Sequence, residues 1–173
     1  MRILFEIDLK NYNPNGTCFV RPSVRGIIIK NGKIAMVHSQ KYDYYKFPGG
    51  GIENGEDHDQ ALIREVREEA GLIVIPSTII GFGCVRQTER GQKEDIFEQN
   101  NFYYRCSVEP EIVGQMLDDY EAEEHFTLEY VFPEDAIHIN RNVNHGPKSQ
   151  SMLEREARVL EILIQENYFS GRK

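Results

Sequence analysis

The stretch from Lys46 to Leu72 constrains the fold more than any other part of the sequence. It begins with Lys-Phe-Pro and three consecutive glycines, which predict a turn. After this turn a helical pattern runs on without glycine or proline until Gly71, at a position where helix C-termini favour glycine. Asp57 opens a capping-box pattern at the other end. The sequence therefore predicts a glycine loop that leads into a helix from about Asp57 to Ala70.

This predicted helix carries a cluster of acidic residues. Glu65, Glu68 and Glu69 are three and four positions apart, so their carboxylates lie close together and repel one another. Oxygen ligands gathered in this way are what a divalent cation such as Mg²⁺ or Mn²⁺ requires. The ordinary alternative is an acidic helix face that only keeps the protein soluble. Both interpretations remain open on the glutamates alone.

The spacing of the whole stretch resembles the Nudix box, G-x5-E-x7-R-E-U-x-E-E-x-G-U, in which U is an aliphatic residue. Gly50, Glu56 and the run from Arg64 to Leu72 match every defined position. Membership of this family implies an α/β (α+β) fold, an α/β/α sandwich with a mixed β-sheet and the acidic loop-helix across one face. We expect residues 1–173 to form a single domain of this kind.

The resemblance also implies an activity, which is the divalent-metal-dependent hydrolysis of a phosphoanhydride bond with Mg²⁺ or Mn²⁺ as cofactor. Glu65, Glu68 and Glu69 would hold the metal, and one of them could serve as general base. The carbonyl of Gly49 is a candidate ligand from the loop. Arg64 would hold a carboxylate in place, because its guanidinium is forked in a way that lysine cannot copy.

Three motif residues are expected to be structural. Gly50 shapes the loop, Gly71 ends the helix, and Glu56 partners Arg64 or the helix N-terminus instead of binding metal directly.

Further candidates for substrate binding lie outside the motif. Arg25 could reach a phosphate, although an arginine on a strand is usually a solvated charge. Tyr45 could stack on a nucleobase, although tyrosines at such positions usually pack in a sheet. Nudix proteins often recruit another acid from a distant loop, and the candidates here are Glu121, Glu123 and Glu124.

The substrate is expected to be a small nucleoside diphosphate derivative. Subfamilies that act on ADP-ribose tend to carry a proline well beyond the box, but this chain has none between Pro76 and Pro110. A nucleoside triphosphate or a nucleotide sugar is therefore favoured. The alternative function is a non-catalytic sensor that binds a nucleotide or metabolite, since a fold does not guarantee an activity. Retention of every acid of the box favours the enzyme.

Composition limits the partners and the compartment. The net charge of −8 disfavours stable binding to nucleic acid or to anionic membranes. No run of apolar residues is long enough for a membrane span, and the N-terminus does not resemble a signal peptide. The three cysteines are odd in number and lack metal-type spacing, which indicates buried thiols in a reducing compartment. We expect a cytoplasmic protein, and a homodimer is compatible with the sequence.

The other elements follow from local patterns. Alternation or β-branched runs predict strands at 3–9, 23–29, 33–38, 72–75, 79–86, within 95–109 and at 127–132. Asn31-Gly32 predicts a hairpin turn. Loops are expected at 87–93, 111–125 and 140–147, the second of them exposed, and a short helical turn at 133–136. A capping-box pattern at Ser151 starts a final helix to about Tyr168, with an apolar stripe of Leu153, Ala157, Leu160 and Ile164.

Overall fold

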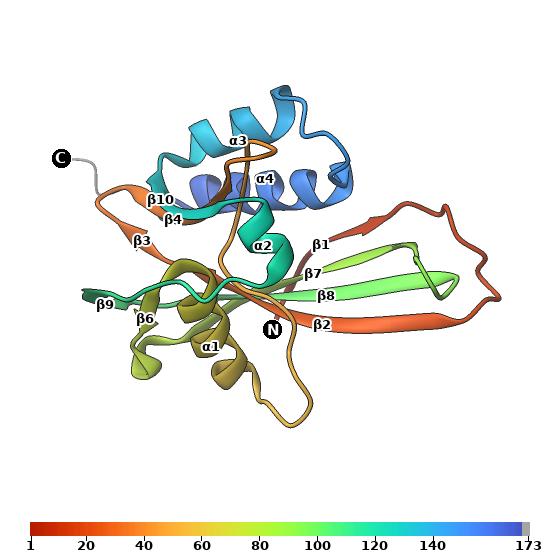
Figure 1. Cartoon of the computed structure of the whole chain (residues 1–173), viewed down its shortest axis with the longest axis horizontal. Helices are drawn as coiled ribbons and strands as arrows, with labels where there is room; N and C mark the ends of the chain where they lie inside the picture. The colour runs from red at the N-terminus through yellow and green to blue at the C-terminus, as the bar shows by residue number, and fades with distance from the viewer. Residues whose placement is uncertain (171–173) are drawn as a thin grey trace.

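The computed structural model describes residues 1–170 and places helices on both sides of a layer of β-sheet (Figure 1). The α/β/α fold class expected from the sequence is confirmed. The strands are β1 (Ile3–Asp8), β2 (Cys18–Ile27), β3 (Ile29–Lys30), β4 (Lys33–Ser39), β5 (Tyr44–Lys46), β6 (Leu72–Val74), β7 (Ile80–Arg90), β8 (Ile96–Arg105), β9 (Val108–Ile112) and β10 (Phe126–Val131). The helices are α1 (His58–Ala70), α2 (Asp119–Glu123), α3 (Pro133–Asn142) and α4 (Gln150–Gln165), with a short 3₁₀ turn at Pro76–Thr78.

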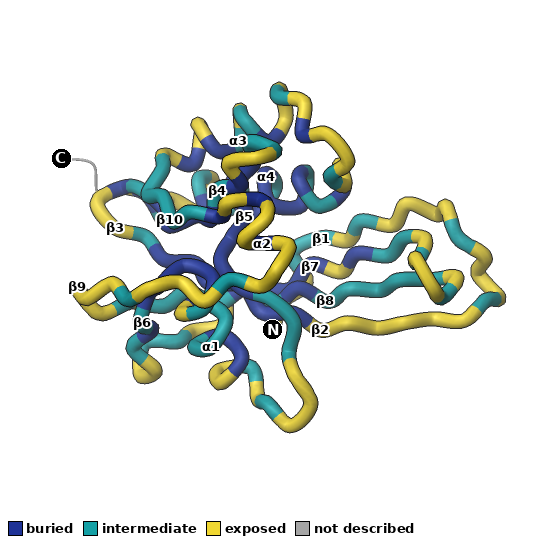
Figure 2. Tube along the Cα trace, in the orientation of Figure 1, coloured by how far each residue is buried: buried dark blue, intermediate teal, exposed yellow. Residues whose placement is uncertain are grey.

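Two larger sheets form the central layer. One has the order β1-β7-β8-β2, and it is mixed because β1 and β2 run parallel to their neighbours while β7 and β8 are antiparallel. The other has the order β10-β4-β3, with β5 also paired to β4. Asn31 and Gly32 both adopt left-handed φ angles between β3 and β4, as the expected hairpin turn requires. The long strands β2, β7 and β8 extend beyond the helices as an arm, which is exposed along the outer half of β2 and of intermediate burial along β8 (Figure 2).

Helix α1 begins and ends where the sequence predicts. The Asp57 side chain accepts a hydrogen bond from the Gln60 N–H at 2.8 Å, and the Gln60 side chain accepts one from the Asp57 N–H at 3.0 Å. Gly71 ends the helix with φ of 67°, and a Cβ there would lie 2.3 Å from the Val113 carbonyl oxygen. Only glycine combines this backbone conformation with such close packing. The ends of the acidic helix are therefore fixed by local contacts.

The Asp57 cap gives a test of this assignment. Replacing Asp57 with alanine leaves the Gln60 N–H without its acceptor, so we expect the free energy of unfolding to fall by about 1 kcal/mol. The measurement is urea denaturation, with Asp59→Ala as a control that removes an acid from the same turn but no cap. Equal losses in the two variants would contradict the capping role.

The core lies on both sides of the central layer. One cluster joins α1 to the sheet through Val24, Leu62 and Val66, and the other joins α4 to it through Leu160 and Leu163. Of the apolar stripe expected on α4, Leu153, Ala157 and Leu160 are buried, whereas Ile164 is only partly covered. These two clusters hold the strands between the helices.

A buried polar network connects α4 to the start of the glycine loop. Glu156 is fully buried and accepts hydrogen bonds from the Phe47 N–H at 2.7 Å and from Arg155 Nε at 2.8 Å. Tyr103 on β8 donates a third hydrogen bond to it at 3.2 Å. The carboxylate therefore fixes the backbone just ahead of the glycines, 109 positions away along the chain.

Several expectations for local structure were wrong. Residues 87–90 continue β7 because they pair with β8, and the loop begins at Gly91. The segment 111–125 contains the end of β9 and helix α2, and it buries two of its acids. The helical turn at 133 continues to Asn142, which shortens the loop expected at 140–147. Helix α4 is capped by Ser149, not Ser151, and Cys18 is exposed instead of buried.

Within residues 1–170, no helix combines the length and the apolar character needed to cross a membrane. The single-domain expectation stays a prediction, and its residues 171–173 lie outside the described range.

Candidate active site

The glycine loop lies directly on strand β2. The Val24 N–H donates to the Gly50 carbonyl at 2.9 Å, and the Gly26 N–H donates to the Pro48 carbonyl at 2.8 Å. A Cβ at Gly49, which has φ of 143°, would lie 2.1 Å from the Val24 carbonyl oxygen. Glycine is required at this position because loop and strand backbones approach so closely. The loop is therefore held rigidly beside α1.

A polar cavity of about 220 Å³ opens beside this loop. Acids from three separate segments line it, together with two arginines. They are Glu53 from the loop, Glu65 and Glu68 from α1, Asp118 and Glu121 at α2, and Arg21 and Arg64. The box acids are thus joined by acids from a segment about 50 positions later, and we call this space the acidic cavity.

Arg64 connects the acids of the motif. Its guanidinium donates to both carboxylate oxygens of Glu56, at 2.6 and 2.8 Å. It also donates to Glu65 at 2.8 Å and to Glu68 at 3.2 Å. The hydrogen bonds from Arg64 lower the pKa of Glu56 to about 2. The contact expected between Glu56 and Arg64 is therefore present, and the same arginine orients two acids of the cavity.

Glu65 depends on the glycine that faces it. A Cβ at Gly50 would lie 2.4 Å from Glu65 Oε2, so the carboxylate fits only because residue 50 has no side chain. Burial raises the pKa of Glu65, with Arg64 acting in the opposite direction. Gly50 therefore determines where this carboxylate lies.

This contact makes Gly50→Ala a specific test. The new methyl group would displace the Glu65 carboxylate, which is the movable end of a side chain, so we expect at least a tenfold loss of turnover with a change in unfolding free energy below about 1 kcal/mol. Turnover and thermal melts should be compared with Gly114→Ala, where a Cβ meets nothing within 4 Å. Wild-type kinetics in Gly50→Ala would contradict this positioning.

Glu69 points away from the acidic cavity and into the protein. Its side chain is 1% exposed, accepts a hydrogen bond from the Gly49 N–H at 2.9 Å and forms an ion pair with Lys46. Burial raises the pKa of Glu69 to about 7, although the positive charges of Lys46 and Arg25 oppose the shift. Its Oε1 touches the Lys46 ammonium but has no hydrogen bond of normal geometry.

Arg25 on β2 contacts the glycine loop. It is 7% exposed, and its guanidinium donates to the carbonyl oxygen of Gly49. Its Nε is buried without a hydrogen-bond partner. Arg25, a substrate-binding candidate from the sequence, is therefore a buried cation and not a solvated surface charge. It contacts the carbonyl of Gly49, and the N–H of the same residue donates to Glu69.

The donor chemistry of this region fits a divalent cation. Glu65 and Glu68 supply carboxylate oxygens inside the acidic cavity, and Glu69 and the Gly49 carbonyl are further oxygen donors of the same loop and helix that do not line it. In this conformation Arg64, Lys46 and Arg25 neutralise or bind these oxygens. Among residues 1–170, no three acidic, histidine or cysteine side chains already converge on one point as a metal site.

The acids that were expected to join the site from a distant loop lie in different places. Glu121 is 7% exposed and lines the acidic cavity, held there by the Asp118 N–H at 2.9 Å and the Tyr120 hydroxyl at 3.0 Å. Glu124 is buried elsewhere and accepts hydrogen bonds from Ser39 and Tyr44.

Two further candidates also lie away from the acidic cavity. Glu123 is exposed and pairs with Lys41. Tyr45 is buried, donates its hydroxyl to Glu129 at 2.9 Å and stacks on His38. Neither residue lines the acidic cavity.

Sequence reasoning missed Lys46, Arg21 and Asp118. Lys46 is the first residue of the stretch from Lys46 to Leu72, but its ion pair with Glu69 spans 23 positions and no local pattern shows it. Arg21 stands two residues before a predicted strand, and extending that strand by alternation would have placed it on the face of Arg25. Asp118 forms a capping-box pattern with Glu121, which could have indicated α2.

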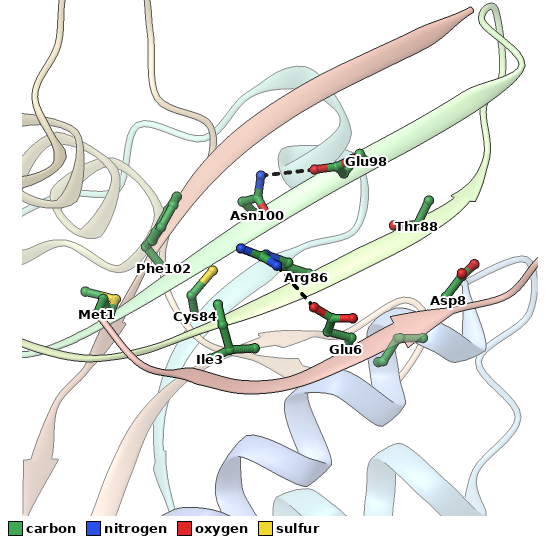
Figure 3. A pocket seen from close by; sticks show the side chains of 11 residues that line it. Met1, Ile3, Glu6, Asp8, Cys84, Arg86, Thr88, Glu98, Asn100 and Phe102 are labelled. Carbon is green, nitrogen blue, oxygen red and sulfur yellow. Dashed lines mark hydrogen bonds and ion pairs between the residues drawn. The ribbon is translucent and has the colours of Figure 1, made fainter. Parts of the chain in front are cut away.

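A larger cavity, of about 490 Å³, lies on an open face of the sheet formed by β1, β7 and β8 (Figure 3). Several polar side chains that line it already have partners. Arg86 donates to Glu6 at 3.2 Å, and Asn100 donates to Glu98 at 3.4 Å. None of the box acids lines it. The acidic cavity is therefore the better candidate for chemistry.

Comparison with known proteins agrees with the fold and the motif. The model of the NUDIX domain matches residues 20–152, and the chain belongs to this family. Over 85 residues it is 33% identical to an ADP-ribose pyrophosphatase of Methanocaldococcus jannaschii, which covers 46% of this chain and 48% of the relative. Over 131 residues it is 28% identical to an RNA pyrophosphohydrolase of Mannheimia succiniciproducens, covering 62% of each. These alignments therefore span about half to three fifths of the relatives.

Solved structures support the fold alone. A NUDIX hydrolase from Nitrosomonas europaea superposes with a TM-score of 0.62 at 18% identity, covering 90% of this chain and 92% of that one. A MutT protein from Bacillus halodurans gives a TM-score of 0.56 at 18% identity, covering 81% and 82%.

Proposed function

We propose that this protein is a divalent-metal-dependent pyrophosphohydrolase that cleaves a phosphoanhydride bond in a nucleoside diphosphate linked to another group. The observation that carries the proposal is the acidic cavity, in which Glu65 and Glu68 of the box meet Glu121 beside the glycine loop. Membership of the NUDIX family and the pyrophosphohydrolases among its relatives support the same reaction class.

The residues of the chain divide the work between holding oxygen ligands and positioning them. Glu65, Glu68, Glu69 and the Gly49 carbonyl are the groups that would hold Mg²⁺ or Mn²⁺. Such a cation, when bound, offsets phosphate charge and lowers the pKa of water. Arg64 fixes the directions of Glu65 and Glu68 through hydrogen bonds, and Glu56 holds Arg64 from the opposite side.

A base for the attacking water is available in the same cavity. Glu65 is one candidate, because burial raises the pKa of its carboxyl and a base with a pKa nearer neutrality transfers protons efficiently. Glu121 is the other, because it reaches the cavity from α2 independently of the box. Tyr45 and Glu124 are not retained, since their polar atoms are engaged elsewhere.

The experiment is hydrolysis of a panel of substrates with and without divalent cation. We expect turnover of at least one nucleoside triphosphate or nucleotide sugar with Mg²⁺ or Mn²⁺, with ADP-ribose a poorer substrate. Excess EDTA should reduce the rate to the uncatalysed background, because the acids alone cannot neutralise phosphate charge. Full turnover in EDTA would refute the metal requirement.

The alternative is a sensor that binds a nucleotide without hydrolysing it. One observation favours it, namely that Lys46 and Arg25 already bind Glu69 and the Gly49 carbonyl in this conformation. Calorimetric binding of a nucleotide without turnover of any panel member in Mg²⁺ or Mn²⁺ would establish the sensor and reject the enzyme.

A further inference from the structure

A third cavity, of about 460 Å³, lies on the arm formed by β2, β7 and β8, near the turn between β7 and β8. Two aromatic rings and three cationic side chains are among its lining residues: Phe19, Phe97, Arg21, Arg90 and Lys93. We call it the arm cavity. None of the Nudix-box residues lines it, so the motif does not account for it. Its volume suits a ligand the size of one nucleoside.

The aromatic pair is placed to receive a flat ligand. Phe19 and Phe97 are opposite each other in the pairing of β2 with β8, and their ring centroids are 6.0 Å apart with planes inclined by 30°. Phe19 is 47% exposed, so part of its ring is open to a ligand. Exposed aromatic faces of this kind stack on nucleobases.

The cations of the arm cavity are available to an anion. In the part of the chain that the structure describes, the side chains of Arg21, Arg90 and Lys93 have no hydrogen bond or ion pair. Two acids also line the cavity, and neither is paired with these cations in the described residues. Glu89 accepts hydrogen bonds from Ser151 at 2.8 Å and from Gln87 at 3.3 Å, and Glu94 is the second acid. The cationic groups therefore remain free in a protein with a net charge of −8.

Arg21 joins the arm cavity to the acidic cavity, because it lines both. Its guanidinium lies against the glycine loop, where a Cβ at Gly51 would be 2.9 Å from Nε and Nη2. Side chains alternate along β2, so Phe19 and Arg21 share one face of the strand. One ligand can therefore stack on the aromatic pair and pass its phosphates over Arg21 towards Glu65.

We propose that the arm cavity is the base subsite of the active site, and that the substrate is a nucleotide whose base stacks on Phe19 and Phe97. Its phosphate chain then crosses Arg21 and places the phosphoanhydride in the acidic cavity. The inference rests on the proposed function, because it extends the same site. The occupant is a mononucleotide and not an RNA 5′ end, because the net charge of −8 opposes binding of a longer phosphate backbone.

The test measures binding and turnover separately. Calorimetry with a methylene-bridged, non-hydrolysable ATP analogue in Mg²⁺ compares the wild type with Phe19→Ala and Phe97→Ala. Each variant should bind roughly tenfold more weakly, the loss expected for one base–aromatic stack. Val20→Ala is the matched control, since Val20 is 49% exposed on the same strand but faces the other way. Inorganic tripolyphosphate, which has no base, should bind all four proteins alike.

The outcomes separate this inference from the proposed function. Wild-type affinity for the analogue in both phenylalanine variants would overturn the base subsite, whether or not the wild type hydrolyses nucleotides. If the wild type hydrolyses no nucleotide but the phenylalanine variants bind the analogue tenfold more weakly, the hydrolase proposal is wrong and the base subsite is supported. A 5′-triphosphate oligoribonucleotide that binds tenfold more tightly than the mononucleotide would overturn the choice of occupant. Thermal melts of the variants should match the control, because both rings lie on the arm.

Discussion

Glu65→Gln and Glu68→Gln are each expected to lower kcat by roughly 10²–10⁴-fold while the protein stays folded. Glutamine keeps the shape of the side chain but removes the charge that would hold a cation, and it cannot accept a proton as a general base. The two acids line the acidic cavity and share hydrogen bonds from Arg64. Either loss therefore affects the proposed ligands without opening the core.

Stability should behave differently from turnover in these variants. Each substitution relieves repulsion between neighbouring carboxylates, and Arg64 keeps its two hydrogen bonds to Glu56. We therefore expect the melting temperature of each variant in EDTA to equal that of the wild type or to be slightly higher. The kinetic measurement is kcat against Mg²⁺ concentration, which distinguishes a weakened ligand from a lost base because only the former is rescued by more cation.

Glu56→Gln is the matched control within the same network. It breaks the forked pair with Arg64, whose hydrogen bonds lower the pKa of Glu56 to about 2, so stability should fall by about 1 kcal/mol after allowance for solvent. Its effect on kcat should be smaller, because Glu56 does not line the acidic cavity. An equal loss of kcat in all three variants would contradict the assignment of Glu65 and Glu68 as metal ligands and of Glu56 as a structural partner of Arg64.

The sequence predicted those parts of the site that depend on short-range patterns. Asp57 and Gly71 set the ends of α1 through contacts within a few residues, and the Asn31-Gly32 turn is equally local. The box spacing identified Glu65 and Glu68 because their positions on one helix decide that they lie together. Local chemistry was sufficient for these features.

Long-range pairing limited the remaining predictions. The extension of β7 over 87–90 is polar and partly exposed, and only its pairing with β8 makes it a strand. Glu121 and Glu124 are three positions apart in one acidic segment, yet one lines the cavity and the other is buried against Ser39. No periodicity in the sequence distinguishes them, because the difference depends on what α2 packs against.

The buried pair of Glu69 and Lys46 predicts a pH dependence of stability in the absence of metal. In EDTA, raising the pH from below 4.5 to above 7 should lower the unfolding free energy of the wild type by about 3 kcal/mol relative to Glu69→Gln. The folded pKa of about 7 exceeds the ordinary glutamate pKa of 4.5. Between these values the folded state holds a proton that the unfolded state has lost, so stability falls as the pH rises.

The same measurement in Mg²⁺ tests whether Glu69 is a ligand. A bound cation beside Glu69 favours the ionised carboxylate, which lowers its folded pKa and should remove most of the pH dependence. Denaturation of the wild type, Glu69→Gln and the exposed control Glu111→Gln, from pH 4 to 9 with and without Mg²⁺, separates the cases. Parallel wild-type and Glu69→Gln curves in EDTA would contradict the raised pKa. A pH dependence that Mg²⁺ leaves intact would mean that Glu69 supports the glycine loop through Gly49 and Lys46 and does not bind the metal.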